Sequence, residues 1–518
     1  MKLSAVLIDT VSIQEYIFLS NKLKENIGAS FLVKKIYEDI LKEALKVTFS
    51  RDIDIKEWEN DPTNIKINQD SEEVEIGYIG GGNALVLFKD KYKTTEFIKN
   101  YTKLLLVKVP GLKTAFGIIH DFDLDNFKNS MKNLHENLRE NKNKYSPNVT
   151  LPKYGFTLDC PRTNESAENF EDPERAESFN EQDAKIKYIS SVAWTKLKFS
   201  DKAKDEMIDK INDILNDKYT LTNDIEKLGQ QEGKDYIAVV HIDGNKMGER
   251  FSKCESLSEY RKLSIGVRNA TEKTFKKMIE ILIKQIKKNK AFDLKNGEFK
   301  LSTENGKIIL PIRPIVLGGD DITFISDGRL GIWLAEIFIK EFANHSINNE
   351  PLSVCGGVSI VKTKYPFYRA YKLAEGLIDK AKKESRKKEG SYIDFFISSS
   401  GWSGSLDGII NKHLSTVNGN LHFGPYRVDK TNEEKSLENL KYIVKEFKNI
   451  PKNKIMKLRE ILFEDKDNAK IYVKELKAKG VKLPQIKGMY YHEHIWQNKE
   501  TPYFDAIELI DFYPEGLL

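Results

Sequence analysis

Hydrophobic and polar residues alternate along this chain in two distinct rhythms. Short apolar runs bounded by turn residues predict strand segments at residues 3–9, 78–88, 236–243 and 315–325. Longer stretches in which apolar residues recur every three to four positions predict amphipathic helices at residues 13–45, 208–228, 257–288 and 433–479. Strands and helices are therefore interspersed along the chain, which predicts a mixed α and β protein.

Three sequence markers occur twice in the same order, which indicates a duplicated unit. They are an aspartate that ends the first strand, a glycine-rich turn, and a glycine inside a later strand. The pairs are Asp9 with Asp243, Gly80 with Gly318, and Gly117 with Gly357, at offsets of 234, 238 and 240 positions. Because the three offsets are nearly equal, the two copies differ in their internal spacing by insertions or deletions of only a few residues.

Each copy contains a strand, a helix, a glycine-centred pair of strands, a helix and a final strand. This βαββαβ order predicts two ferredoxin-like domains of the α+β class. Between them the residues are largely polar, and after residue 400 the pattern becomes helical. We expect the copies at residues 1–145 and 231–400, a linker and helical region at 146–230, and a helical domain at 401–518.

Composition and charge restrict the function. The 518 residues include 83 Lys and Arg and 78 Asp and Glu, for a net charge of +5. That small excess excludes a uniformly basic coat for nucleic acid, and 40% hydrophobic residues exclude global disorder. The three scattered cysteines fit a reducing compartment, and the first apolar stretch is too short for a signal or a membrane span. A cytoplasmic protein with no membrane partner is expected.

The strongest chemical signal is the run Gly318-Gly319-Asp320-Asp321 between two apolar strands. Two adjacent carboxylates repel each other unless a cation lies between them, and Mg²⁺ prefers carboxylate oxygens and phosphates. Asp243 ends the preceding apolar strand and adds a third carboxylate, while Gly244 leaves a carbonyl accessible. The pattern favours a two-metal nucleotidyl-transfer site over an ordinary hairpin turn.

A second group of residues fits the phosphates of a nucleotide. Lys382 and Arg386 lie four positions apart in a helical pattern, so they share one face. Such a pair can grip the β- and γ-phosphates, although a solvated basic helix end explains the same residues when they are taken alone.

These motifs resemble a known family. Asp243-Gly244-Asn245-Lys246-Met247-Gly248, Gly318 to Asp321, Cys355 to Val358 and the helix with Lys382 and Arg386 resemble the second palm of the large polymerase-like subunit of type III CRISPR effector complexes. Ile13 to Phe18, Gly28 to Ser30 and Gly80-Gly81-Gly82-Asn83 resemble its first palm. Similar palm motifs occur in GGDEF-type diguanylate cyclases, whose signature has a glycine at the position of Ser385.

The resemblance implies a function in antiviral defence, in which ATP is joined into a cyclic oligoadenylate second messenger. It implies that Asp243, Asp320 and Asp321 hold two Mg²⁺ or Mn²⁺ ions and that Lys382 and Arg386 hold triphosphate. Gly80, Gly81, Gly82 and Asn83 would line the second nucleotide's site, in a palm without an acid at its turn. Guide or target RNA and CRISPR effector subunits are the implied partners, and homo-oligomers are left open.

The chain also departs from the family. Asn245 replaces a second acid that is frequent there, the zinc-binding cysteines between the palms are missing, and the sequence starts at the first palm without an HD nuclease domain. No zinc is therefore expected. The dipeptide His120-Asp121 is read as surface, and His492 and His494 as incidental.

Two other functions stay open at this point. The chain could be a non-catalytic scaffold of an RNA-guided complex, or a stand-alone cyclase that makes a cyclic di- or mononucleotide. A basic helical patch could contact RNA, but most charged helix faces are only solvated. Its residues are Lys273, Lys276, Lys277, Lys284, Lys287 and Lys288.

Overall fold

A computed structural model describes residues 2–144, 157–170, 188–228, 235–288, 301–398, 404–431, 433–464, 466–486 and 495–517, together with Phe292 and Phe299. The chain divides into two compact units. The first contains residues 1–213, 246–272 and 315–321, and the second contains residues 214–245, 273–314 and 322–518. His492 and His494 lie outside the described residues.

The first unit contains a four-stranded antiparallel sheet in the order β2-β3-β1-β4. Its strands are β1 (Lys2–Val11), β2 (Val74–Gly80), β3 (Asn83–Phe88) and β4 (Lys113–Asp123). Its main helices are α1 (Ile13–Phe18), α2 (Leu23–Lys35), α3 (Leu41–Phe49), α5 (Lys91–Lys108), α6 (Phe127–Asn143), α7 (Ser191–Lys198), α8 (Ser200–Lys210) and α10 (Met247–Ser252). A π-helix, η1 (Ile36–Ile40), joins α2 to α3, and the short α4 (Glu57–Asn60) precedes β2.

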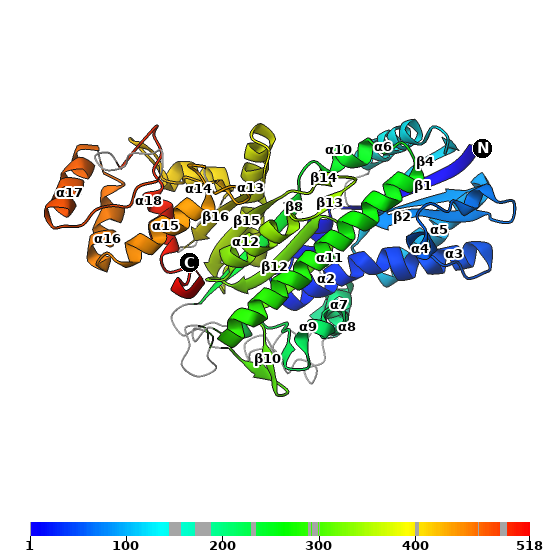
Figure 1. Ribbon diagram of the computed structural model, residues 1–518. Helices are drawn as coiled ribbons and strands as arrows, with labels where there is room; N and C mark the ends of the chain where they lie inside the picture. Colours follow the sequence, from blue (N-terminus) through cyan, green and yellow to red (C-terminus); the bar gives the residue numbers. More distant parts are fainter. Residues whose placement is uncertain are drawn as a thin grey trace. The chain divides into compact units, whose positions relative to one another are not determined.

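The second unit is built on a sheet that repeats this strand order and extends it. The six-stranded sheet has the order β11-β12-β8-β15-β16-β19. Figure 1 labels β8, β12, β15 and β16 of this sheet. Its strands are β8 (Tyr236–Gly244), β11 (Ile312–Gly318), β12 (Asp321–Asp327), β15 (Val354–Lys362), β16 (Tyr392–Ser398) and β19 (Tyr426–Arg427). Its first four strands match β2-β3-β1-β4 position by position, so the predicted α+β class with two ferredoxin-like domains is confirmed.

The long helix α11 (Leu257–Lys288) has the bounds that its apolar spacing predicts. The other helices around the second sheet are α12 (Gly331–Phe342) and α13 (Phe367–Lys387), followed by α14 (Leu406–His413), α15 (Leu437–Lys448), α16 (Lys452–Ile461), α17 (Lys466–Ala478) and α18 (Tyr503–Leu509). The last three helices before α18 fill the stretch at 433–479 that was predicted to be helical. None of the described helices is long and apolar enough to cross a membrane.

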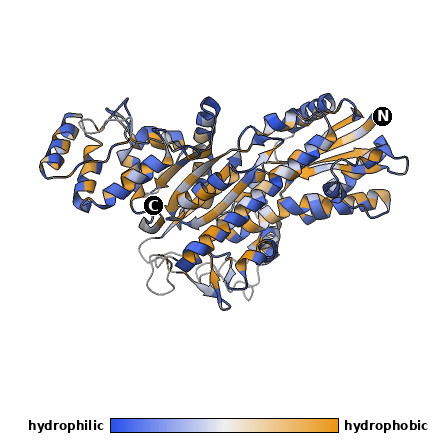
Figure 2. Cartoon of the chain, in the orientation of Figure 1, coloured by the Kyte–Doolittle hydropathy of each residue, from blue (hydrophilic) through white to orange (hydrophobic). Residues whose placement is uncertain are grey.

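Burial follows the hydropathy pattern of the strands. Ala5, Val6 and Leu7 of β1 and Val239 and Val240 of β8 are almost fully buried. Figure 2 shows strands that are largely hydrophobic and helices with alternating hydrophilic and hydrophobic faces. Central strands buried on both faces explain why they read as continuous apolar runs.

The repeated glycine inside the later strand has a packing role in both sheets. A Cβ on Gly117 of β4 would lie 2.7 Å from the Leu134 carbonyl oxygen of α6. A Cβ on Gly357 of β15 would lie 2.1 Å from the Ala374 carbonyl oxygen of α13. Each glycine therefore lets the helix that follows the strand pack directly on the strand backbone. This contact sets the height of α6 above β1 and of α13 above β8.

The helix predicted at residues 208–228 is wrong. After α8 and the short α9 (Asn212–Leu215), the chain turns at Asn216 and Asp217, which have φ values of 48° and 54°. Strand β7 (Tyr219–Thr220) then pairs in parallel with β10 (Lys307–Ile309), which also pairs with β9 (Thr303–Glu304). Strand pairing with a segment almost ninety positions away outweighs the local helical spacing.

The predicted single helical stretch at residues 13–45 is interrupted. It consists of α1, a break around Ser20, α2, the π-helix η1 and the start of α3. A π-helix is uncommon and frequently lies near a functional site. Here the Tyr37 hydroxyl contacts the Gly82 carbonyl oxygen, and the Glu38 carboxylate contacts Lys35.

Candidate active site

The carboxylates predicted from sequence stand at the ends of two paired strands. Asp243 lies near the end of β8, and Asp321 begins β12. The strands are antiparallel with Ile322 opposite Ile242, the residues that adjoin Asp321 and Asp243 in the chain. Asp320 occupies the turn before β12. In both strands, the acidic residue therefore lies at the end of a buried strand interior.

Asp243 has a charged partner in the second unit. Its carboxylate forms an ion pair with the ammonium group of Lys382, which lies on α13. The Asp243 side chain is 33% exposed and that of Lys382 is 21% exposed, so the pair remains accessible to solvent. Arg386 follows one turn later on α13 and is exposed. Two of the residues predicted for phosphate and metal binding are therefore in direct contact.

The first sheet contains a counterpart of this pair. Asp9 near the end of β1 forms an ion pair with Lys142 of α6. Asp9 is opposite Ala115 of β4, as Asp243 is opposite Cys355 of β15. Both lysines lie on the helix that packs over the glycine-containing strand. The sequence comparison missed Lys142, although its distance from Lys382 is 240 positions, the same offset as that of the strand glycines.

The two glycine-rich turns approach each other within the first unit. Gly81, Gly82 and Gly319 have φ values of 59°, 77° and 59°, which side chains other than glycine adopt at a cost. A Cβ on Gly319 would lie 3.5 Å from the Cα of Gly81. The Gly82 carbonyl oxygen accepts hydrogen bonds from the Thr10 backbone N–H at 3.1 Å and from the Tyr37 hydroxyl at 2.5 Å.

Both turns line one cavity of about 770 Å³ in the first unit. Gly80, Gly81 and Asn83 come from the first turn, and Gly319 and Asp320 come from the second. Helices α6, α10 and α11 supply the remaining walls. Their lining residues include Phe127, Lys128, Lys132, His135, Glu136, Arg139, Met247, Phe251, Tyr260, Ser264 and Arg268. A cavity of this size lies within the range of small-molecule sites.

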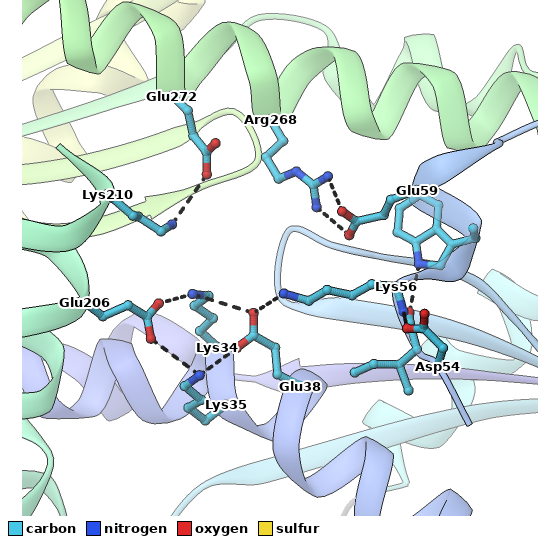
Figure 3. Close-up of polar contacts among 12 residues, drawn as sticks. Lys34, Lys35, Glu38, Asp54, Lys56, Glu59, Glu206, Lys210, Arg268 and Glu272 are labelled. Carbon is cyan, nitrogen blue, oxygen red and sulfur yellow. Dashed lines mark hydrogen bonds and ion pairs between the residues drawn. The ribbon is translucent and has the colours of Figure 1, made fainter. Parts of the chain in front are cut away.

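Helix α11 holds the cavity together through residues on successive turns. The Thr271 hydroxyl donates a hydrogen bond of 2.6 Å to the Gly319 carbonyl oxygen. A Cβ on Gly80 would lie 3.0 Å from the Ser264 hydroxyl oxygen, so the helix also contacts the first turn. Arg268 binds both carboxylate oxygens of Glu59 at 2.8 Å (Figure 3). One helix thus fixes both turns.

Arg261 of α11 anchors the edge strand of the first sheet. Its guanidinium is fully buried and donates to the backbone oxygens of Ile76 and Gly77 at 2.7 and 2.8 Å and to the Glu75 carboxylate at 2.8 Å. It thereby satisfies carbonyls on the open side of β2, whose end is the Gly80 turn. Arg261 is a positioning residue for that turn.

The π-helix η1 connects the first turn to an ion-pair network. Tyr37 points to Gly82, whereas Glu38 binds Lys35 at 2.8 Å and Lys56 at 3.3 Å. Burial opposes ionisation of Glu38, but the hydrogen bond from Lys35 and the charges of Lys34, Lys35 and Lys56 outweigh it and lower the pKa of Glu38 to about 2. In Figure 3, Lys34 and Lys35 also reach Glu206 of α8.

One wall of the cavity is aromatic. The ring centroids of Tyr78 and Tyr260 are 4.6 Å apart, and those of Phe251 and Tyr260 are 4.7 Å apart. Burial raises the pKa of Tyr260 to about 12, so its hydroxyl stays protonated at neutral pH. Such a wall presents apolar faces on which a purine ring could stack.

Helix α6 contributes basic residues to the cavity lining. Lys128, Lys132, His135 and Arg139 of α6 line the cavity. Lys128 forms an ion pair with Glu255 at 2.5 Å. Burial lowers the pKa of His135, so the imidazole is neutral at neutral pH. Sequence reasoning missed these residues, although their spacing on one helical face was readable.

Residues 236–390 match the family model described as Cas10/Cmr2, second palm domain. This range contains Asp243, Asp320 and Asp321, the three predicted catalytic residues, and helix α13 with Lys382 and Arg386. The chain is similar to Cas10/Cmr2 over this part of its length. A comparison with curated protein sequences gives no match.

Several solved structures share the fold of this chain. A Csm1-Csm4 cassette in complex with cA4 is 14% identical, with a TM-score of 0.54 over 98% of this chain and 69% of the other. The cassette in complex with AMPPNP is 14% identical, with a TM-score of 0.50 over 99% of this chain and 69% of the other. Csm1 in T. onnurineus is 14% identical, with a TM-score of 0.50 over 99% of this chain and 70% of the other. The shared fold extends over nearly the whole of this chain.

Asn245 stands where the resemblance leads one to expect a second acid, and its contacts in the second palm give it a structural role. Its side-chain amide donates to the Ser353 hydroxyl at 3.1 Å and to the Gly390 carbonyl oxygen at 3.3 Å. Asn245 is buried and holds the loop before β15 and the loop after α13. It is therefore used for packing, and Asp243 carries the charge at this strand end.

The donor set that remains suits a hard cation. Asp243, Asp320 and Asp321 offer carboxylate oxygens, which Mg²⁺ and Mn²⁺ prefer, and the Gly244 carbonyl lies next to Asp243 in the chain. In the described part of the chain, no group of three or more His, Cys, Asp or Glu side chains is arranged to hold a metal ion. The position beside Asp243 holds the Lys382 ammonium group instead.

Proposed function

We propose that this Cas10-like chain is a nucleotidyltransferase that joins ATP into a cyclic oligoadenylate second messenger. The observation that carries the proposal is the cavity that contains both glycine turns, because an acceptor and a donor nucleotide must meet in one site. Its aromatic wall suits a purine, and its basic wall suits phosphates.

In this proposal the two palms have different roles. The acceptor nucleotide binds at the first glycine turn, which has no carboxylate. This turn consists of Gly80, Gly81, Gly82 and Asn83. Gly318 and Gly319 let the donor's phosphates approach the backbone, and Lys382 and Arg386 bind its β- and γ-phosphates. The 3′-hydroxyl oxygen of the acceptor forms a bond to the α-phosphorus and loses its proton to water. The bond from that phosphorus to the β-phosphate oxygen breaks, and pyrophosphate leaves.

Asp243, Asp320 and Asp321 would hold Mg²⁺ or Mn²⁺, with the Gly244 carbonyl nearby. When bound, the metal supplies charge neutralisation at the α-phosphate and lowers the pKa of the attacking hydroxyl. Lys382 now neutralises Asp243, and its ammonium group becomes available to a triphosphate when Asp243 binds a cation instead. No side chain is needed as a dedicated base, because positioning and charge do most of the work in phosphoryl transfer.

The names of the similar structures agree with this assignment. Csm1-Csm4 cassettes bind cA4 in one crystal and AMPPNP in another. A Csm1-Csm4 subcomplex with a TM-score of 0.50 is described as part of a type III-A CRISPR-Csm interference complex. By analogy, we expect an effector subunit of the Csm4 kind and a guide or target RNA as partners of this chain.

The proposal is tested by pyrophosphate release. Purified protein is incubated with each NTP and Mg²⁺ or Mn²⁺, with and without guide and target RNA and its effector subunits. ATP should give the fastest release. If no NTP releases pyrophosphate in any combination, while the protein co-purifies with small RNA and other subunits, the chain is a scaffold rather than an enzyme.

A further inference from the structure

Helix α13 ends in a short loop, residues 388–391, that leads into strand β16. Each of the four carbonyl oxygens of this loop accepts a hydrogen bond. The donors are the Tyr392 hydroxyl to Lys388 at 3.1 Å, the Arg427 guanidinium to Glu389 at 2.7 Å, the Ser385 hydroxyl to Gly390 at 2.7 Å and the Val428 backbone N–H to Ser391 at 2.9 Å. Loop carbonyls at a protein surface ordinarily bond to water, so a loop that is held at every residue has a fixed position.

This loop holds the end of α13 that carries the two proposed phosphate ligands. Ser385 lies between Lys382 and Arg386 in the chain and is buried, whereas Arg386 is exposed. The buried hydroxyl therefore fastens the last turn of the helix to the Gly390 carbonyl oxygen. Because the last turn of a helix frays readily, this contact determines where both cations stand.

The same Gly390 carbonyl oxygen is also tied to the strand near whose end Asp243 lies. The Asn245 side-chain amide donates to it at 3.3 Å, while the Asn245 backbone N–H donates to the Ser353 carbonyl oxygen at 2.9 Å. One oxygen atom thus joins the strand end with the carboxylate to the helix end with the cations. The ion pair between Asp243 and Lys382 spans the same two elements.

Arg427 of β19 fastens the loop from beyond residues 236–390, the range that matches the second palm domain. Its side chain is buried, and besides Glu389 it binds the carboxylates of Asp429, at 2.9 Å, and Glu433. Asp429 in turn accepts a hydrogen bond of 3.2 Å from the Ser391 backbone N–H. The planar guanidinium and its counter-ion therefore hold the loop at two residues.

Arg427 also connects the loop to the helices that follow in the chain. Its backbone N–H donates to the Lys435 carbonyl oxygen at 2.7 Å. The next residue, Ser436, caps α15 by accepting a hydrogen bond of 3.2 Å from the Asn439 backbone N–H. Within the second unit, one buried side chain thus links the start of this helical stretch to the end of α13.

We propose that Arg427 is a positioning residue for triphosphate binding. It fixes the loop 388–391, the loop fixes the last turn of α13, and that turn sets Lys382 and Arg386 relative to Asp243. The inference rests on the proposed function, because it takes the two cations as triphosphate ligands. It adds that the chain beyond residue 400 takes part in holding the nucleotide.

The test compares Arg427→Gln with a matched control. Arg427→Gln removes the guanidinium from the loop. Arg329→Gln breaks another buried ion pair of the same unit, in which Arg329 binds Asp327 at 2.8 Å, at the end of β12 opposite to Asp321. Ser385→Ala removes one hydroxyl group from the same series of contacts, and it tests the inference if Arg427→Gln does not fold.

Binding of ATP with Mg²⁺ is measured first, by calorimetry. Arg427→Gln should weaken it by about tenfold and Ser385→Ala by about threefold, because the cations lose their fixed geometry. Arg329→Gln should stay within about twofold of the wild type, since distant sites act independently. Wild-type affinity in both Arg427→Gln and Ser385→Ala would overturn the inference.

A double variant shows whether Arg427 acts through the helix cations. Arg427→Gln combined with Lys382→Gln should bind ATP no more than about twofold more weakly than Lys382→Gln alone, because residues that act through one another are not additive. Losses that add in full would mean that Arg427 acts elsewhere, and the inference would fail.

Hydrogen exchange supplies a measurement that needs no nucleotide. The backbone amides of residues 383–391 should exchange faster in Arg427→Gln than in the wild type, and at the wild-type rate in Arg329→Gln. Unchanged exchange of this segment in Arg427→Gln would contradict the positioning role, even if ATP bound more weakly.

Turnover separates this inference from the proposed function. If ATP is consumed, Arg427→Gln should raise the KM for ATP more than it lowers kcat. If the wild type binds ATP but turns over no NTP, and Arg427→Gln still weakens binding, the proposed function fails and the positioning role stands. If turnover is present and Arg427→Gln matches Arg329→Gln in affinity, KM and exchange, the positioning role fails and the function stands.

Discussion

The two palms of this chain share a scaffold and differ at one turn. Both sheets have the same strand order, both have a glycine under the following helix, and both pair an aspartate at a strand end with a lysine on that helix. At the turn, Gly82 and Asn83 of the first palm stand where the second palm has Asp320 and Asp321.

This difference separates the structural features that both palms share from the feature that the proposed reaction needs. The aspartate–lysine pair survives in the palm that lacks the acidic turn, so the pair alone does not mark a catalytic palm. The turn carboxylates are what the second palm adds. The second sheet also continues into β16 and β19, which have no counterpart in the first sheet among the described residues.

The largest effect is expected from the turn. Asp320→Asn with Asp321→Asn removes two carboxylates with little change in shape, so turnover should fall at least about a hundredfold, on the order of 3 kcal/mol or more. Asp9→Asn in the first palm should leave turnover within about threefold. Initial rates of pyrophosphate release measure both. A strong loss in Asp9→Asn with activity retained in the turn variant would reverse the assigned roles.

The extension of the second sheet predicts a pH-dependent difference between the units. His422 is buried between Asp394 at 3.0 Å and Asp505 at 3.7 Å. Burial lowers the pKa of His422, but the two carboxylates outweigh it and raise it to about 10. Because the folded-state pKa exceeds the unfolded value of about 6.5, the stabilisation is complete below pH 6.5 and is lost as the pH rises through about 10.

The measurement is urea unfolding of wild type and His422→Asn at several pH values between 6 and 10. The wild type should lose on the order of 4 kcal/mol more than the variant over this range. The same slope in both proteins would show that the histidine is not held in its charged form by Asp394 and Asp505.

The strand glycines should respond to the same substitution to different degrees. An added Cβ at Gly357 meets a backbone oxygen at 2.1 Å, and one at Gly117 meets a backbone oxygen at 2.7 Å. Gly357→Ala should destabilise its unit by about 3 kcal/mol and Gly117→Ala by about 1–2 kcal/mol. Thermal unfolding checks the order, and a larger loss at Gly117 would contradict the packing described for α13.

The smallest effect concerns the two lysines. Lys382→Gln removes a proposed triphosphate contact and should raise the KM for ATP by about tenfold, roughly 1.4 kcal/mol, with a smaller change in kcat. Lys142→Gln should leave both constants nearly unchanged. Steady-state kinetics with ATP separates the two, and equal effects would mean that the palms share the donor's phosphates.

The elements predicted correctly from the sequence are those that local hydrophobic periodicity indicates. It found both palms, the full length of α11 and the two glycine turns, because strand ends and turns have strong short-range signals. It failed at residues 208–228, where β7 depends on a distant partner, and at Asn245, whose role depends on Ser353 and Gly390.

Lys132, Arg139 and Lys142 were also missed, although α6 has a readable stripe. A stripe of cations acquires meaning only when it faces a cavity, and sequence does not reveal that cavity. Lys142 could have been found by applying the offset of 240 positions to Lys382. The domain boundaries and the roles of the site residues remain predictions.

The central claim is that the second palm's turn carboxylates make a cyclic oligoadenylate from ATP. The most direct test is a mass spectrum of the ATP-derived products of the wild type and of Asp320→Asn with Asp321→Asn, with target RNA and effector subunits present. The account predicts rings of adenylate units from the wild type alone. Identical products from both proteins, or no ATP-derived product from either, would contradict it.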